Sequence, residues 1–165
     1  MFRWARLSIV CLTFWGGNAL AQDYLSALNE LGRTATAAEL SAWDIDVRPD
    51  FLGLPPGSGS VAQGEALWLD QCASCHGDFG DSNEVFSPIV LGNITEDDVR
   101  TGRVAALTDP SVVRTTFMKV ATLSTIWDYI NRAMPWNAPK SLAADEVYSL
   151  VAYLLNLAYI VDDDF

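Results

Sequence analysis

The residues best suited to chemistry lie in one short stretch. Cys72, Cys75 and His76 form the pattern Cys-x-x-Cys-His, and they are two of the three cysteines and the single histidine among 165 residues. This spacing matches c-type haem attachment, because two thiols add to the two vinyl groups of one porphyrin and the next histidine reaches the iron. The stretch therefore predicts one covalent haem c with His76 as proximal ligand.

Three other uses of this stretch compete with haem attachment. A thioredoxin-type redox pair needs a strand–turn–helix setting and a second strand pattern, which the sequence lacks. A structural zinc site needs a fourth ligand, and the remaining cysteine, Cys11, lies in a segment that we expect to be removed. A simple disulfide between Cys72 and Cys75 is the third alternative. We favour haem attachment over all three.

Residues 1–21 have the pattern of a secretory signal peptide. Arg3 and Arg6 precede an apolar run over residues 7–15, and Ala-Leu-Ala at 19–21 is a small-x-small cleavage site. The run is shorter than the ~20 residues that span a bilayer, so we expect cleavage and no membrane insertion. We predict export to the bacterial periplasm.

The composition limits the remaining classes of function. The chain carries 10 basic and 21 acidic residues, and loss of the two arginines in the signal peptide moves the net charge from -11 to -13. Such a charge argues against binding nucleic acid or an anionic membrane. A hydrophobic content of 50% is enough to fill the core of one domain.

The pattern around the attachment stretch is helical. Ser60 and Gln63 form a capping box, after which Val61, Gly64 and Trp68 share one face of a helix leading to the cysteines. A second helix follows Ser141, which we expect to be its cap. Its apolar stripe consists of Val147, Leu150, Val151, Leu154, Leu155 and Ala158.

Two further helices are expected between these. One begins near Ser124 or Thr125 and has Ile126, Trp127, Ile130 and Ala133 on one side. Asp109-Pro110 resembles a cap followed by a first-turn proline, which predicts another helix towards Lys119. Because no stretch alternates with period two, we predict an all-α fold.

The sixth position of the iron decides between electron transfer and ligand binding. The mature chain has two methionines, Met118 and Met134. Met134 ends a predicted helix before Pro135, which turns the side chain into a loop, whereas Met118 lies in an apolar helical pattern and fits as core filler. We therefore predict Met134 as the second axial ligand, with an open iron as the alternative.

Together these features resemble a class I cytochrome c over residues 60–160. The resemblance implies a small helical haem-wrapping domain in which a glycine and an aromatic on the first helix cross the last helix. The places that match this crossing are Gly64, Trp68, Leu150 and Tyr153. It also implies that the carbonyl of Pro88 orients His76, although Pro88 also reads as an ordinary loop breaker.

A narrower resemblance covers nearly all of the mature chain. Residues 42–50, 53–59 and 127–135 are similar to the cytochrome subunit of the bacterial Sox sulfane dehydrogenase and to its relatives paired with molybdenum sulfite dehydrogenases. This resemblance implies a molybdenum-cofactor partner and a downstream electron acceptor. That subunit is typically larger and carries two haems, whereas this chain has one attachment sequence. The stretch 114–121 also lacks the Trp-Pro expected there.

We therefore divide the chain into a signal peptide (1–21), an N-terminal extension or linker (22–59) and a cytochrome c domain (60–165). The extension has a helical start followed by Pro- and Gly-rich sequence. It either packs on its own domain or wraps a partner subunit.

The predicted function is outer-sphere electron transfer, which needs no acid, base or nucleophile, so the chain alone is not expected to be catalytic. Trp127, Tyr129 and Trp136 are candidates for shielding the haem, and Arg48 or Arg132 for pairing with its propionates. The alternatives are a freely diffusing periplasmic carrier and a haem protein that binds a small ligand at an open iron.

Overall fold

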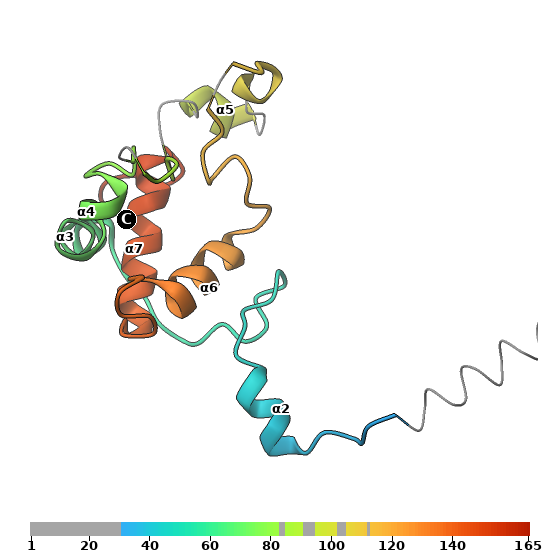
Figure 1. Ribbon diagram of the computed structural model, residues 1–165. Coiled ribbons are helices and arrows are strands. Elements are labelled where there is room, and N and C mark those ends of the chain that lie inside the picture. Colours follow the sequence, from blue (N-terminus) through green and yellow to red (C-terminus); the bar gives the residue numbers. More distant parts are fainter. Residues whose placement is uncertain (1–30, 83–84, 91–94, 102–104, 112) are drawn as a thin grey trace, which may run out of the picture. The chain divides into compact units, whose positions relative to one another are not determined.

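The structure is a computed structural model that describes residues 31–82, 85–90, 95–101, 105–111 and 113–165 (Figure 1). Within these ranges the chain forms helices, turns and extended segments, with no strand, which confirms the all-α prediction. The elements are α2 (Ala37–Trp43), α3 (Val61–Gln71), α4 (Ala73–His76), α5 (Glu96–Thr101), the 3₁₀ turn η1 (Ala105–Thr108), α6 (Leu123–Ala133) and α7 (Ala144–Leu157). The predicted signal peptide, residues 1–21, lies outside the described residues.

The chain divides into two units, one ending at Asp44 and a compact one from Ile45 to Phe165. The described part of the first unit contains α2, which begins after a capping box formed by Thr36 and Glu39 and has no buried residue. The sequence placed the start of the domain at Ser60, but the compact unit already includes residues 45–59. This part of the predicted extension therefore packs with the domain that follows it.

Helices α3 and α7 cross at close range in the compact unit. The Ser60–Gln63 capping box is formed as predicted, and Val61, Gly64 and Trp68 are buried. A Cβ on Gly64 would overlap the carbonyl oxygen of Ser149 and lie 2.8 Å from the Cβ of Tyr153. Only glycine allows the two helix backbones to approach this closely.

Helix α7 begins at Ala144, three residues after the cap that the sequence suggested. The backbone N–H of Ala143 donates to the carboxylate of Glu146 at 2.7 Å, so Glu146 rather than Ser141 caps this end. The predicted stripe is buried, except for a half-buried Leu155, and Ser149, Ala152 and Tyr153 are buried as well. The side chains of α7 are buried beyond the stripe because α3 covers the face that carries Ser149 and Tyr153.

Helix α6 also packs against α7, and its bounds agree with the helix predicted near Ser124 (Figure 1). The helix predicted from Pro110 to Lys119 is wrong. There the backbone N–H groups of Thr116 and Phe117 donate to the carbonyls of Pro88 and Ile89 at 3.0 and 3.2 Å. These tertiary hydrogen bonds satisfy groups that a helix would have paired internally. Across the described ranges, no helix combines the length and apolar composition needed to cross a bilayer.

Gly64→Ala tests the helix crossing. Alanine favours an exposed helix by ~1 kcal/mol over glycine, but here the added methyl group must displace the α7 backbone. We expect the free energy of unfolding to fall by about 1–3 kcal/mol, the usual cost of overpacking. Urea denaturation of the holoprotein measures this loss of stability. Ala62→Ser, at an exposed position on the same helix, should change stability by less than ~0.5 kcal/mol. If both substitutions changed the free energy of unfolding by the same amount, the close crossing of α3 and α7 would be contradicted.

Candidate haem attachment site

The attachment stretch lies on a single helical turn at the end of α3. Cys72 ends α3 and precedes α4, and its carbonyl accepts the backbone N–H groups of Cys75 and His76 at 3.1 and 3.0 Å. Gly77 then closes the turn with a φ of +76°, a conformation that favours glycine. Both thiols and the imidazole thus extend from one short helical turn.

The crossing of α3 and α7 holds this turn through two aromatic side chains. Trp68 Nε1 donates to the carbonyl of Gly77 at 2.9 Å, and the Tyr153 hydroxyl donates to the carbonyl of Asp78 at 2.9 Å. The two rings also contact each other, with centroids 6.0 Å apart. The backbone that follows His76 is therefore fixed by side chains from both crossing helices.

His76 lies between two aromatic rings. Its centroid is 5.9 Å from that of Trp68 and 5.6 Å from that of Phe86. Burial lowers the pKa of His76 below its usual value, so the imidazole is neutral at pH 7 and keeps a lone pair for a metal. The environment suits a haem ligand better than a charged surface histidine.

The hydrogen bond from His76 to the carbonyl of Pro88 that the family resemblance implies is not formed. The Nδ1 atom of His76 is buried and has no hydrogen-bond partner within the described part of the chain. The carbonyl of Pro88 instead accepts the backbone N–H of Thr116 at 3.0 Å. Pro88 therefore anchors the segment around Thr116 in this structure.

The two thiols differ in their surroundings. Cys72 is partly buried, and burial, followed by the nearby charges of Cys75 and Asp70, raises its pKa to about 11. Cys75 is exposed, and the two cysteines are not joined in a disulfide. Among the described residues, no group of three or more Cys, His, Asp or Glu side chains is arranged to hold a metal ion directly. The donor set of two free thiols and a neutral imidazole fits haem c.

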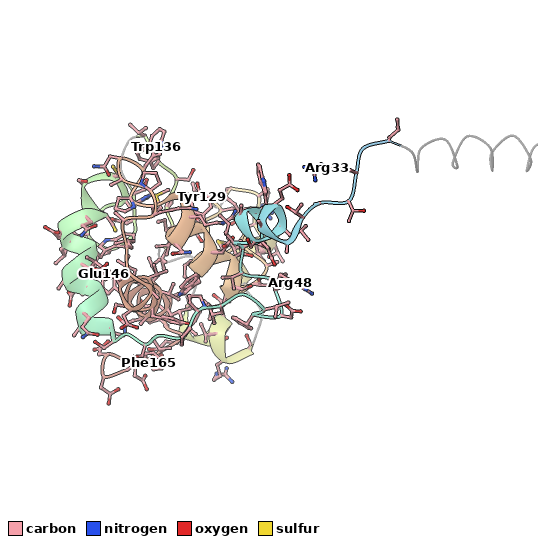
Figure 2. The ribbon with its side chains drawn as sticks, turned by 90° about the horizontal axis from the view of Figure 1, so that it is seen from below. Arg33, Arg48, Tyr129, Trp136, Glu146 and Phe165 are labelled. Carbon is pink, nitrogen blue, oxygen red and sulfur yellow. The ribbon has the colours of Figure 1, made fainter. Side chains whose placement is uncertain are left out.

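A second side of the site is formed by the end of α6. Met134 follows the last helical residue in an extended conformation and is half-buried. Trp136, two residues later, is 75% exposed and meets Phe86 edge-on with centroids 6.2 Å apart (Figure 2). Because Phe86 also contacts His76, this ring joins the methionine loop to the histidine turn.

Met118 lies in a loop, since the helix predicted around it is absent. Its backbone N–H donates to the hydroxyl of Thr115 at 3.4 Å, and its side chain is half-buried. Met118 is therefore not part of a helical core, although its backbone is tied to the fully buried Thr115. Both methionines have to be compared by experiment.

The two arginines that were predicted to pair with the haem propionates bond to carboxylates of the protein instead. Arg132 donates to Asp128 and Arg48 to Asp50. Tyr129 is 59% exposed on α6 (Figure 2).

Trp127 is buried against Tyr148, with centroids 5.6 Å apart. Its Nε1 atom is also buried and lacks a partner within the described ranges. An unpaired, buried indole N–H on the helix that ends at Met134 is a donor available to a polar group of a bound cofactor.

The sequence did not single out Phe86 or Asp128. Phe86 had no signal beyond being aromatic, because its role depends on two tertiary contacts. Asp128 had a local signal in its spacing of four residues from Arg132, which places the two side chains together on a helix.

Two cysteines and a histidine on one turn, fixed by a crossing of two helices, define a c-type cytochrome domain. A family model described as cytochrome c oxidase, cbb3-type, subunit III matches residues 59–154. The match covers more than half of the chain, which therefore belongs to this family of c-type cytochromes and functions in electron transfer with a covalently bound haem c.

The chain is also similar to a solved structure, the sulfane dehydrogenase SoxCD from Paracoccus pantotrophus. The identity is 43% and the TM-score 0.65, over 82% of this chain and 62% of the other. The chain thus spans about three fifths of the length of the chain it matches. No curated protein matches it. The resemblance predicted from the sequence is confirmed.

Alkylation of the haem-free protein tests the environment of the two thiols. At pH 8 we expect iodoacetamide to modify Cys75 before Cys72, because a pKa of about 11 leaves Cys72 almost entirely protonated and the thiolate is the reactive form. Raising the pH towards 11 should narrow the difference between the alkylation rates of Cys75 and Cys72. Peptide mass spectrometry follows each site, and urea-unfolded protein is the control. Faster modification of Cys72 in the folded chain would contradict the described burial.

Proposed function

We propose that the chain is a periplasmic monohaem cytochrome c that accepts electrons from a molybdenum-type sulfur-compound dehydrogenase, of which it is a subunit. The observation that best supports this proposal is the 43% identity with a chain of the sulfane dehydrogenase SoxCD. That match includes 82% of this chain, whereas the compact unit from Ile45 to Phe165 makes up less than three quarters of it. The similarity thus extends into the segment before Ile45, beyond the haem domain.

In this proposal Cys72 and Cys75 bind one haem covalently, and His76 and Met134 are its axial ligands. The bound haem supplies reversible one-electron chemistry. Thioether ligation by Met134 favours the ferrous form and hence a raised reduction potential. The single attachment sequence supports one haem for each chain.

The residues around the site contribute orientation and an apolar surrounding. Trp68 and Tyr153 hold the backbone after His76, and Phe86 packs against the imidazole. Such fixed geometry suits electron transfer, because little has to rearrange when the charge of the iron changes. Trp136, next to Phe86 and largely exposed, provides an apolar surface at which a redox partner can dock.

The charge of the exported chain favours a partner with a basic docking surface. Export is supported by the signal-peptide pattern of residues 1–21, and removal of that segment leaves a net charge of -13. Opposite charges accelerate encounter and lose their effect as salt screens them. Electrons then pass to a downstream acceptor.

Met134→Ala tests the axial ligation. We expect the ferric spectrum to lose the charge-transfer band that reports sulfur ligation. We also expect the potential to fall by on the order of 0.1 V, part of the ~0.8 V range over which axial ligands act. Spectroelectrochemistry of the holoprotein measures both. Met118→Ala is the matched control and should leave both unchanged. The opposite pattern would assign the ligand to Met118, and no change in either variant would indicate an open or differently ligated iron.

Isolation from the native host tests the partner. At low ionic strength we expect the cytochrome to co-purify with a molybdenum-containing subunit and to be reduced when a sulfane or sulfite substrate is added. Between ~0.01 and ~0.15 M ionic strength the screening length falls from ~30 to ~8 Å, so reduction should slow severalfold. Stopped-flow absorbance of the haem follows the rate. A lone monomer that no such dehydrogenase reduces would instead identify a freely diffusing carrier.

A further inference from the structure

A buried carboxylate on α6 has no part in the proposed electron transfer. Asp128 is only 7% exposed and lies on the helix that ends at Met134. It accepts three hydrogen bonds, from the backbone N–H of Val47 at 3.1 Å and from Nε and Nη2 of Arg132 at 3.0 and 2.5 Å. A buried charge with this many donors is costly to disturb, because removing one partner leaves the others unpaired.

One of the bonded groups belongs to a compact turn at the start of the unit. Val47 is 6% exposed. After it, Arg48 N–H donates to the carbonyl of Leu52 at 3.0 Å and Phe51 N–H to that of Arg48 at 2.8 Å. A Cβ on Gly53 would overlap the carbonyl of Asp46. Residues 46–54, which we call the N-terminal clasp, are therefore closed on themselves, and the backbone N–H of Val47 bonds them to Asp128 of α6.

The other bonded group leads to the methionine. Arg132 lies two residues before Met134, in the last turn of α6. Met134 itself is joined to that turn by its backbone N–H, which donates to the carbonyl of Ile130 at 3.1 Å. Asp128 thus connects the clasp directly to the helical turn from which Met134 extends.

We propose that Asp128 is a positioning residue that fixes Met134 relative to the iron by holding the N-terminal clasp against α6. The proposal rests on the His76/Met134 ligation proposed above. The strength of the iron–sulfur bond then depends on a contact made 81 residues earlier in the chain. Loss of that contact releases the last turn of α6 and lets Met134 leave the iron more often.

Imidazole binding to the ferric holoprotein tests this. Imidazole occupies the sixth position only when Met134 has left it, so its apparent affinity rises in proportion to the open fraction. We expect Asp128→Ala to bind imidazole on the order of tenfold more tightly than the wild type, because a charged buried hydrogen-bond acceptor is lost. Asp128→Asn keeps an acceptor for Val47 but loses the charge opposite Arg132, and it should shift the affinity in the same direction by less. The reduction potential of Asp128→Ala should fall as well.

A matched control removes the same charge from an exposed pair. Asp97 pairs with Arg100 on α5, and its side chain is 70% exposed. Asp97→Asn should leave imidazole affinity within about twofold of the wild type, as expected for a surface pair. Val47→Ala weakens the packing of the clasp while every residue of α6 stays unchanged, and it should tighten imidazole binding. If Asp128→Ala yields no holoprotein, imidazole binding to Asp128→Asn and Val47→Ala tests the proposal instead.

Hydrogen exchange gives a readout that is independent of the iron. The peptide containing Met134 should exchange faster in Asp128→Ala than in the wild type, because the last turn of α6 opens more often. In Asp97→Asn it should exchange at the wild-type rate. Wild-type affinity and wild-type exchange in both Asp128 variants would overturn the inference while leaving the ligand assignment intact. If Met134→Ala itself binds imidazole no more tightly than the wild type, the ligand assignment fails and the inference with it.

Discussion

The approach of Gly64 to the backbone of Ser149 is the contact on which the haem site depends. With no side chain at Gly64, α3 lies directly on α7, and the residues four positions further along each helix, Trp68 and Tyr153, meet with their ring planes inclined at 52°. Each then donates one hydrogen bond to the backbone immediately after His76. The backbone that follows the imidazole is therefore held by helix packing, in addition to the hydrogen bonds within the attachment turn itself. A larger residue at Gly64 would push α7 away from α3 and so separate the Tyr153 hydroxyl from the carbonyl of Asp78.

The methionine side of the site is built differently, from contacts between short segments. Phe86 lies between His76 and Trp136, so that one ring touches the attachment turn and the loop after Met134. Asp128 joins α6, the helix that ends at Met134, to the N-terminal clasp. In the ligation proposed above, the histidine side is supported by a long helix crossing and the methionine side by a few side chains. That ligation would make ligand exchange easier to tune at Met134 than at His76.

Local signals in the sequence predicted the helices that depend on local interactions. The Ser60–Gln63 capping box and the apolar stripes of α6 and α7 appear in the structure because capping and amphipathic burial act over a few residues. The helix expected after Pro110 had equally good local signals, but its backbone pairs with Pro88 and Ile89 instead. The Cys-x-x-Cys-His spacing likewise identified the attachment residues, because the whole motif lies within five consecutive residues. Phe86 and the Val47–Asp128 bond escaped prediction because each joins segments far apart in the chain, and no local pattern marks such pairs.

The order of the elements along the chain has a consequence for maturation. Helix α7, which completes the crossing, comes last, so Cys72 and Cys75 are made long before the structure that surrounds them can close. Contacts between such distant segments form slowly compared with local helices. Once the crossing has formed, burial raises the pKa of Cys72 to about 11 and makes that thiol a poor nucleophile at neutral pH. Thioether formation therefore proceeds most readily on the open chain, and folding then protects the completed bonds.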